Sequence, residues 1–289
     1  MSRQVTPRQI LTQPKRPIQG GSGLTNSQGY KWPELGNRIA LWEEFNLNTL
    51  NASYGHILDS PIPEMGEIRP RPQEALVGLT VNSDSDVNRL IMWNDAVLRP
   101  TLAYAKSRLR LNEGVLLRHQ VTTPDMTSLA AIPGRLPPPD GWEPWPLRQL
   151  AQACVLAKTR YGYIQTEEEV TVCCFSSVEG DKKLKAFIMP IPLTRHGASV
   201  LTADLALWWL CMLAMSSPKN REIQTEEEMI KINDWRLHGN GNNLVMAAPS
   251  LEPGALLRSA QIGHTTAEVP SQSRQEAETP KKSAVYFLV

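Results

Sequence analysis

The spacing of apolar residues along the middle of the chain predicts alternating helices and strands. Apolar residues that recur every three or four positions predict helices over residues 33–50, 84–102, 147–158 and 199–215, with a shorter one over 229–235. Runs of β-branched and apolar residues predict strands over residues 76–81, 114–121, 126–132, 161–165, 170–175 and 185–191. Because helices and strands alternate, we predict an α/β fold with a mixed central sheet flanked by helices.

Two of the predicted helices carry further local signals. The Ser-Asp-Ser-Asp sequence at residues 83–86 offers side chains that cap the start of the second helix. Pro100 lies inside that helix and lacks a backbone donor, so we expect it to kink the helix or divide it in two. The helix over 199–215 is apolar nearly all round, which predicts that it is buried on most sides.

The predicted strands also have distinct faces. Tyr161 and Tyr163 alternate and so fall on the same face of their strand. Gly162, between them, permits close packing or an unusual backbone angle where the preceding helix turns into the strand. Cys173 and Cys174 are adjacent in the next strand, so they are expected to point to opposite faces as half-buried apolar residues.

The two ends of the chain differ in composition from its middle. Residues 1–30 contain four basic and no acidic residues and are rich in Gln, Pro, Gly and Ser, which predicts a disordered basic arm. Such an arm is either a solvated tail or a nucleic-acid or nuclear-import segment. Residues 249–289 predict a second disordered tail, whose apolar end at 285–289 is a frayed terminus, an edge strand or a docking peptide. The ordered domain is predicted to span 31–248, with its core at 84–215.

Charge and cysteine content narrow the classes of function. The formal net charge of 289 residues is only +1, so no global charge indicates nucleic acid, although a local basic groove is still compatible with it. The N-terminal sequence has no apolar segment typical of a secretion signal. The four cysteines form no C-x-x-C pair, which favours a reducing compartment. We therefore expect an intracellular protein, cytoplasmic or nuclear, with no membrane association.

Several short segments follow one another in an informative order. Pro124-Asp125 precedes the sequence IPGR at residues 132–135, the helix over 147–158 and the sequence TRYGYI at residues 159–164. This order resembles that of PD-(D/E)XK nuclease-like domains of the restriction-endonuclease-like superfamily, which are common in fungal proteins. The resemblance covers residues 84–215 and implies a restriction-endonuclease-like mixed central sheet flanked by helices.

The same resemblance implies a metal site of which only part is present. In nucleases of this type, an aspartate corresponding to Asp125 holds a divalent metal together with a second acid, and a lysine acts two residues after that acid. Here Arg135 and Pro137 occupy the acid and lysine positions. A guanidinium cannot ligate a cation, and proline supplies no amine. The resemblance therefore implies a nuclease scaffold that has lost hydrolysis, with Asp125 as a remnant and no cofactor expected.

Basic residues near this degraded motif are candidates for binding without cutting. Arg135, Arg148, Lys158 and Arg160 cluster in the sequence, and arginine pairs bidentately with phosphate oxygens. They are therefore candidate nucleic-acid contacts. The alternative interpretation is that Arg148, Lys158 and Arg160 are solvated charges at helix ends.

Three hypotheses for function follow from these patterns. The first is a catalytically degenerate nuclease-fold protein that binds nucleic acid or a protein partner. The second is an active, Mg²⁺-dependent nuclease that uses Asp125 with an acid that has migrated from its usual position. The third is a pure protein-interaction module, in which exposed tryptophans such as Trp142 and Trp145 contact the partner.

Overall fold

The computed structural model describes most of the predicted core and parts of both ends of the chain. The described residues are 5–15, 19–20, 33–35, 38–63, 80–81, 84–111, 117–120, 145–166, 168–180, 183–216, 218–234, 236–238, 245–247 and 283–288. Within these ranges, no helix is both long enough and apolar enough to cross a membrane.

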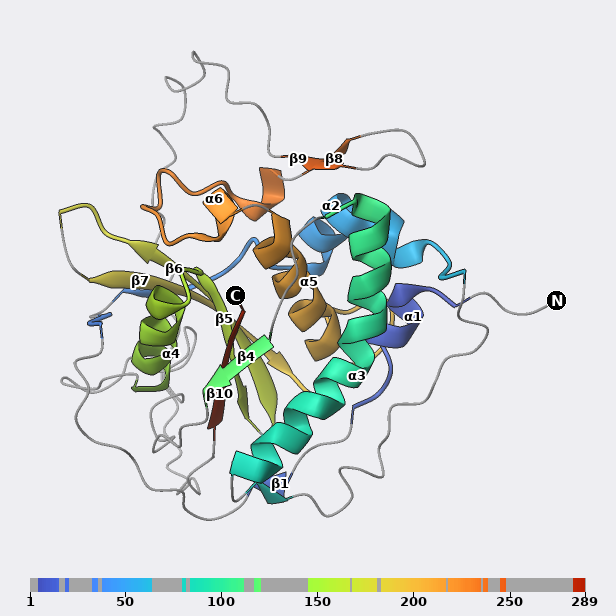
Figure 1. Cartoon of the computed structure of the whole chain (residues 1–289), viewed down its shortest axis with the longest axis horizontal. Coiled ribbons are helices and arrows are strands. Elements are labelled where there is room, and N and C mark those ends of the chain that lie inside the picture. The colour runs from blue at the N-terminus through green and yellow to red at the C-terminus, as the bar shows by residue number, and fades with distance from the viewer. Residues whose placement is uncertain are drawn as a thin grey trace, which may run out of the picture.

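A mixed sheet of six strands, in the order β2-β7-β6-β5-β10-β4, forms the centre of the fold (Figure 1). Its strands are β2 (Ile39–Leu41), β4 (Leu117–Gln120), β5 (Tyr161–Thr166), β6 (Glu169–Ser177), β7 (Leu184–Pro192) and β10 (Ser283–Leu288). Strands β2 and β7 are parallel, and the other neighbouring pairs are antiparallel. The strands predicted over 114–121, 161–165, 170–175 and 185–191 are confirmed where they are described, whereas 126–132 lies outside the described residues.

Helices cover both faces of this sheet, as Figure 1 shows. They are α1 (Pro7–Leu11), α2 (Leu47–Asp59), α3 (Asp84–Leu109), α4 (Trp145–Leu156), α5 (Ala203–Ser216) and α6 (Pro218–Arg221). One buried cluster joins α4 to one face of the sheet, and a larger cluster joins α1, α2, α3 and α5 to the other. The prediction of an α/β fold with a mixed sheet flanked by helices is therefore confirmed.

Outside the main sheet, short strands pair in twos. Strand β1 (Gln19–Gly20) pairs with β3 (Thr80–Val81), and β8 (Arg236–His238) pairs with β9 (Val245–Ala247). The strand predicted over 76–81 is confirmed at its described end by β3.

Helices α5 and α3 test two predictions from the sequence, burial of the apolar helix and interruption of the helix that contains Pro100. Every described side chain of α5, from Ala203 to Met215, is buried, which confirms that this helix is enclosed on all sides. It lies between the sheet and α3, so both of its faces contact apolar neighbours. Pro100 does not divide α3, which is one helix from Asp84 to Leu109, although α3 changes direction partway along its length (Figure 1).

The predicted faces of the strands are confirmed. Tyr161, Tyr163 and Cys174 lie in the larger cluster, whereas Ile164 and Cys173 lie in the α4 cluster on the opposite face. All four cysteines are free and buried, so the expectation that Cys173 and Cys174 are only half-buried is wrong. Alternation along a strand therefore predicted correctly which residues share a face of the sheet.

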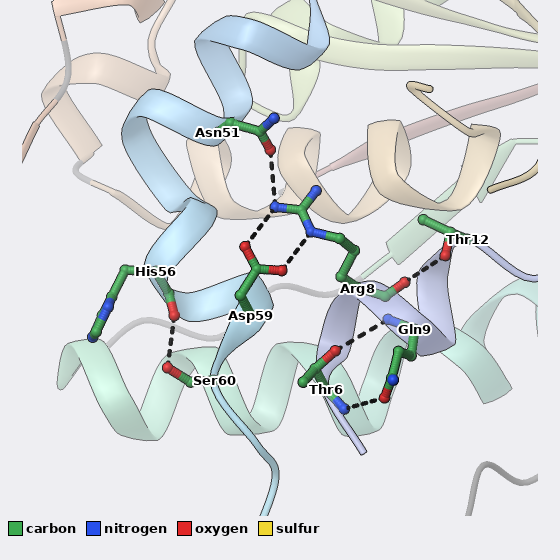
Figure 2. A network of polar contacts seen from close by, with 8 residues as sticks. All are labelled: Thr6, Arg8, Gln9, Thr12, Asn51, His56, Asp59 and Ser60. Atoms are coloured by element: carbon green, nitrogen blue, oxygen red, sulfur yellow. Dashed lines mark hydrogen bonds and ion pairs between the residues drawn. The ribbon is translucent and has the colours of Figure 1, made fainter. Parts of the chain in front are cut away.

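The N-terminal segment departs from the sequence prediction. The disordered arm expected over residues 1–30 is wrong for residues 5–15, where Val5, Ile10 and Leu11 are buried in the larger cluster. Figure 2 shows the Arg8 guanidinium between α1 and α2, where Nε and Nη2 donate to the two carboxylate oxygens of Asp59 at 2.6 and 3.0 Å. Composition did not predict that this segment is folded, because its few apolar residues are all buried and its basic side chains pair with residues far away in the sequence.

Lys15 ends this segment inside the core. Its Nζ donates to Asn94 Oδ1 at 2.8 Å and lies 3.2 Å from Asp204 Oδ1. Both side chains of this ion pair are only 2 % exposed. Asn94 Nδ2 in turn donates to Gln165 Oε1 at 2.7 Å. This buried polar network connects the N-terminal segment to α3, α5 and β5.

The C-terminal end is also ordered where it is described. The disordered tail expected over residues 249–289 is wrong for Ser283–Leu288, which form β10. This strand is not at an edge, because it pairs with β5 on one side and β4 on the other. Without β10, the long strand β5 would leave its backbone groups on that side unpaired.

Two predicted helices are wrong or displaced. Residues 39–41 of the helix expected over 33–50 instead form β2, whose residues align in parallel with Ala186–Ile188 of β7. Helix α2 begins only after Asn46, whose side-chain Oδ1 accepts from the backbone of Thr49 at 3.1 Å. In the segment expected to be helical at 229–235, the described residues 229–234 contain a 3₁₀ turn at Ile232–Asp234 and no α-helix.

Candidate functional site

The residues of the degraded nuclease motif lie outside the described residues. These motif residues are Asp125, Arg135 and Pro137. Trp142, a candidate contact for a protein partner, also lies outside the described residues. On α3, Asp95 pairs with Arg99 one turn along the helix. Among the described residues there is no group of three or more His, Cys, Asp or Glu side chains placed to hold a metal ion.

The three described basic candidates do not form one cluster. Arg148 lies on α4, where its Nε donates to the carbonyl of Pro33 at 3.0 Å. Lys158 is exposed in the turn after α4. Arg160 is 1 % exposed and lies against Tyr161, on the face of the sheet opposite to α4. The structure therefore separates the side chains that lie close together in the sequence.

Lys158 has a structural role at the end of α4. Its φ of +53° is in the left-handed region. The backbone N–H of Lys158 donates to Val155 at 3.2 Å, and that of Thr159 donates to Cys154 at 3.0 Å. These two hydrogen bonds form a Schellman motif, in which glycine is the preferred residue at the left-handed position.

We expect Lys158→Gly to stabilise the protein. Relief of left-handed strain, about 1–2 kcal/mol, exceeds the backbone entropy cost of glycine, about 0.5–1 kcal/mol, so the free energy of unfolding should rise by about 0.5–1 kcal/mol. Urea denaturation measures this change. Lys158→Ala is the control, because it removes the same charge but keeps the strained Cβ. A gain of equal size in Lys158→Ala would assign the effect to charge instead.

Among the predicted binding residues that the structure describes, Arg160 lines a pocket. Its Nη2 donates to the phenol oxygen of Tyr161 at 2.7 Å, and its guanidinium carbon lies 4.9 Å from the centre of the Tyr161 ring. Its backbone is fixed on both sides, since its N–H donates to Arg221 at 2.6 Å and its carbonyl accepts from Phe175 at 2.8 Å. These contacts hold the guanidinium in one orientation.

The pocket is built across four neighbouring strands. Tyr161 of β5 is aligned with Cys174 of β6, which is aligned with Phe187 of β7. Trp42 follows β2, the next strand in this row. Glu226 and four residues from Met229 to Ile232 complete the lining, so the pocket combines residues of the sheet with a segment distant in sequence.

Arg160 has no counter-ion in the described part of the chain. Its Nε and Nη1 are buried and make no hydrogen bond. The two ionisable side chains that act on it are those of Tyr161 and Cys174. Burial raises the pKa of Tyr161 to about 12 and the pKa of Cys174 to about 11. Both are therefore neutral at physiological pH, and neither balances the buried guanidinium charge.

The remaining walls of the pocket are largely apolar. They come from Trp42, Phe187, Met229, Ile230 and Ile232. The pocket volume is about 80 Å³, which exceeds the space that one water molecule needs and is small for a drug-sized ligand. The pocket therefore suits a small chemical group or the end of a larger ligand.

Charged side chains also line the pocket. Glu44, Glu226 and Lys231 are among its lining residues. Glu226 is already paired, because its carboxylate lies 2.7 Å from Lys185 Nζ. Unlike these three side chains, Arg160 is fully buried.

Most of this pocket was not predicted from the sequence. Trp42, Glu44 and the segment 226–232 carry no motif, and they meet Arg160 only through the order of the strands. One signal was available: Arg160 directly precedes a strand with closely packed apolar neighbours, where a charged residue is costly unless it is paired.

The fold and the pocket define this chain as an α/β protein with a buried arginine at the end of its central sheet. No known protein family, curated protein or solved structure matches its sequence or fold.

Proposed function

We propose that this chain is a restriction-endonuclease-like domain that has lost phosphodiester hydrolysis and acts by binding an anionic ligand. The order of helices and strands over residues 84–215, and the mixed sheet with helices on both faces, support this scaffold. The replacement of the expected acid and lysine by Arg135 and Pro137 supports the loss of hydrolysis.

One observation carries the binding part of the proposal. The Arg160 guanidinium is buried beside a pocket, with two nitrogens unpaired and no carboxylate partner in the described part of the chain. An isolated buried charge is unfavourable by several kcal/mol. A bound anion would remove this penalty, and arginine is well suited to carboxylate and phosphate. Because the pocket is small and partly apolar, it favours a compact anion over the long backbone of a nucleic acid, which remains the alternative partner.

A nuclease assay tests the loss of hydrolysis. We expect no cleavage of single-stranded or duplex DNA or RNA above background with Mg²⁺ or Mn²⁺, and no difference between the wild type and Asp125→Asn. The physical reason is that a site with Arg135 in place of an acid repels the metal that would activate water.

Two outcomes would change this proposal. Metal-dependent cleavage that disappears in Asp125→Asn would establish the alternative, an active nuclease with a migrated acid. Tight, salt-dependent retention on DNA without cleavage would point to nucleic acid as the ligand. Asp140→Asn, which removes another acid near the motif, is the matched control for Asp125→Asn.

A further inference from the structure

We propose that the Arg160 pocket recognises a carboxylate that carries a short apolar substituent. This inference rests on the proposed function, and it names the chemical class of the anion. The carboxylate would accept hydrogen bonds from the guanidinium, and the apolar substituent would lie between Trp42 and Ile230 on the pocket walls.

Hydrogen-bond geometry is the first argument for an oxygen acceptor. Nη2 of Arg160 is already bound to the Tyr161 phenol oxygen, while Nε and Nη1 are unpaired. Unpaired buried donors are rare, since most buried polar groups have a partner. The Tyr161 contact also orders the side chain before a ligand arrives, so less rotamer entropy is lost on binding.

The balance of charge favours a monoanion over a phosphate dianion. The cations at the pocket are Arg160 and Lys231, with Lys185 adjoining, and the carboxylates are Glu44 and Glu226. Among these described side chains, the cations exceed the carboxylates by one charge. A carboxylate therefore neutralises the site, whereas a dianion would add a charge that the two glutamates repel.

The apolar walls provide the second part of the recognition. Trp42 is 4 % exposed, and Phe187, Met229 and Ile230 are partly buried. Burial of a few methylene groups against such walls contributes roughly 0.8 kcal/mol for each group, which the shortest carboxylates cannot gain. We therefore expect affinity to increase from acetate to butyrate.

Four small probes separate these contributions. Butyrate is the ligand model, butyramide is its uncharged match, acetate lacks most of the apolar part, and inorganic phosphate tests the other anion class. Binding is measured by titration calorimetry, and the Arg160 Nε–H resonance in a ¹⁵N-labelled sample reports whether the guanidinium gains an acceptor. A leucine-terminated tripeptide, with a free or an amidated C-terminus, tests whether a polypeptide end is the source of the carboxylate.

We expect butyrate to bind the wild type at least about tenfold more tightly than butyramide or phosphate, and Arg160→Gln to lose this preference. Lys158→Gln, which removes an exposed cation of the preceding turn, should leave binding unchanged. Ile230→Glu places a further carboxylate at a half-buried position of the pocket, and it should weaken butyrate binding even if Arg160→Gln fails to fold.

The possible failures are distinguishable. If phosphate binds more tightly than butyrate and the binding depends on Arg160, the carboxylate inference is wrong and the proposed anion-binding function stands. If none of the anions binds in an Arg160-dependent manner, water alone satisfies the guanidinium and both proposals fail. If butyrate binds equally well to Ile230→Glu and to the wild type, the ligand lies elsewhere and the inference is also wrong.

Discussion

Replacement of Gly162 by alanine is expected to destabilise the protein by about 1–2 kcal/mol. A Cβ atom at this position would lie 2.7 Å from Leu150 Cδ1 and 3.1 Å from Cys154 Sγ. Both neighbours belong to the buried side of α4, so they cannot move into solvent. The overpacking cost of about 1–3 kcal/mol exceeds the gain of about 0.5–1 kcal/mol in backbone entropy that alanine usually brings. Urea denaturation provides the free energy of unfolding.

The same substitution elsewhere provides a control of opposite sign. Gly55 lies within α2, and a Cβ there would be 3.8 Å from Asn51 Cβ, an ordinary contact. Gly55→Ala is therefore expected to stabilise the protein by about 0.5–1 kcal/mol. A double-mutant cycle locates the clash, because Gly162→Ala should cost less when Leu150 is already alanine. If the two substitutions are additive, Leu150 is not the source of the strain.

The parts of the fold that could be predicted are those in which local pattern and tertiary environment agree. The strands β5 and β6 are buried along most of their length, and β7 alternates between buried and partly buried residues. Helix α5 is apolar nearly all round, and its side chains from Ala203 to Met215 are all buried. In these segments, hydrophobic burial requires the same conformation that the local spacing of residues indicates.

The segments that could not be predicted depend on partners far away in the sequence. The composition of residues 5–15 is that of a polar arm, but in the fold Asp59, Asn94 and Asp204 bind the basic side chains of this segment. Ser283–Leu288 is too short to indicate its place, which is set by two strands that precede it by more than a hundred residues. The composition of a segment does not specify which residues elsewhere in the chain pair with it, so it cannot predict order that depends on such tertiary contacts.

The candidate site follows the same rule. The sequence makes Arg160 a candidate nucleic-acid contact because it lies near other basic residues along the chain, with a solvated helix-end charge as the alternative. The structure buries it beside Tyr161 and separates it from Arg148 and Lys158. What makes Arg160 informative is the absence of a counter-ion in the described part of the chain, and this can be judged only from the tertiary neighbours.

The largest loss of stability is expected for Lys15→Met. This substitution keeps most of the side-chain volume but leaves the buried Asp204 carboxylate without the cation that lies 3.2 Å away. Removal of one partner from a buried ion pair typically costs about 3–5 kcal/mol. Asp204 lies in the first turn of α5, where the helix dipole favours a negative charge. We therefore expect a loss near the lower end of this range, measured by urea denaturation with limited proteolysis of the N-terminal segment as a second readout.

Two variants show whether this loss comes from the buried charge. Lys183→Met breaks a pair with Glu34 whose side chains are 43 % and 64 % exposed, so it should change the free energy of unfolding by less than about 1 kcal/mol. The double variant Lys15→Met, Asp204→Leu removes both charges and should recover much of the stability, because an apolar pair needs no desolvation of ions. If Lys15→Met behaves like Lys183→Met, residues 5–15 are not part of the folded core, and the N-terminal segment is the disordered arm that its composition predicts.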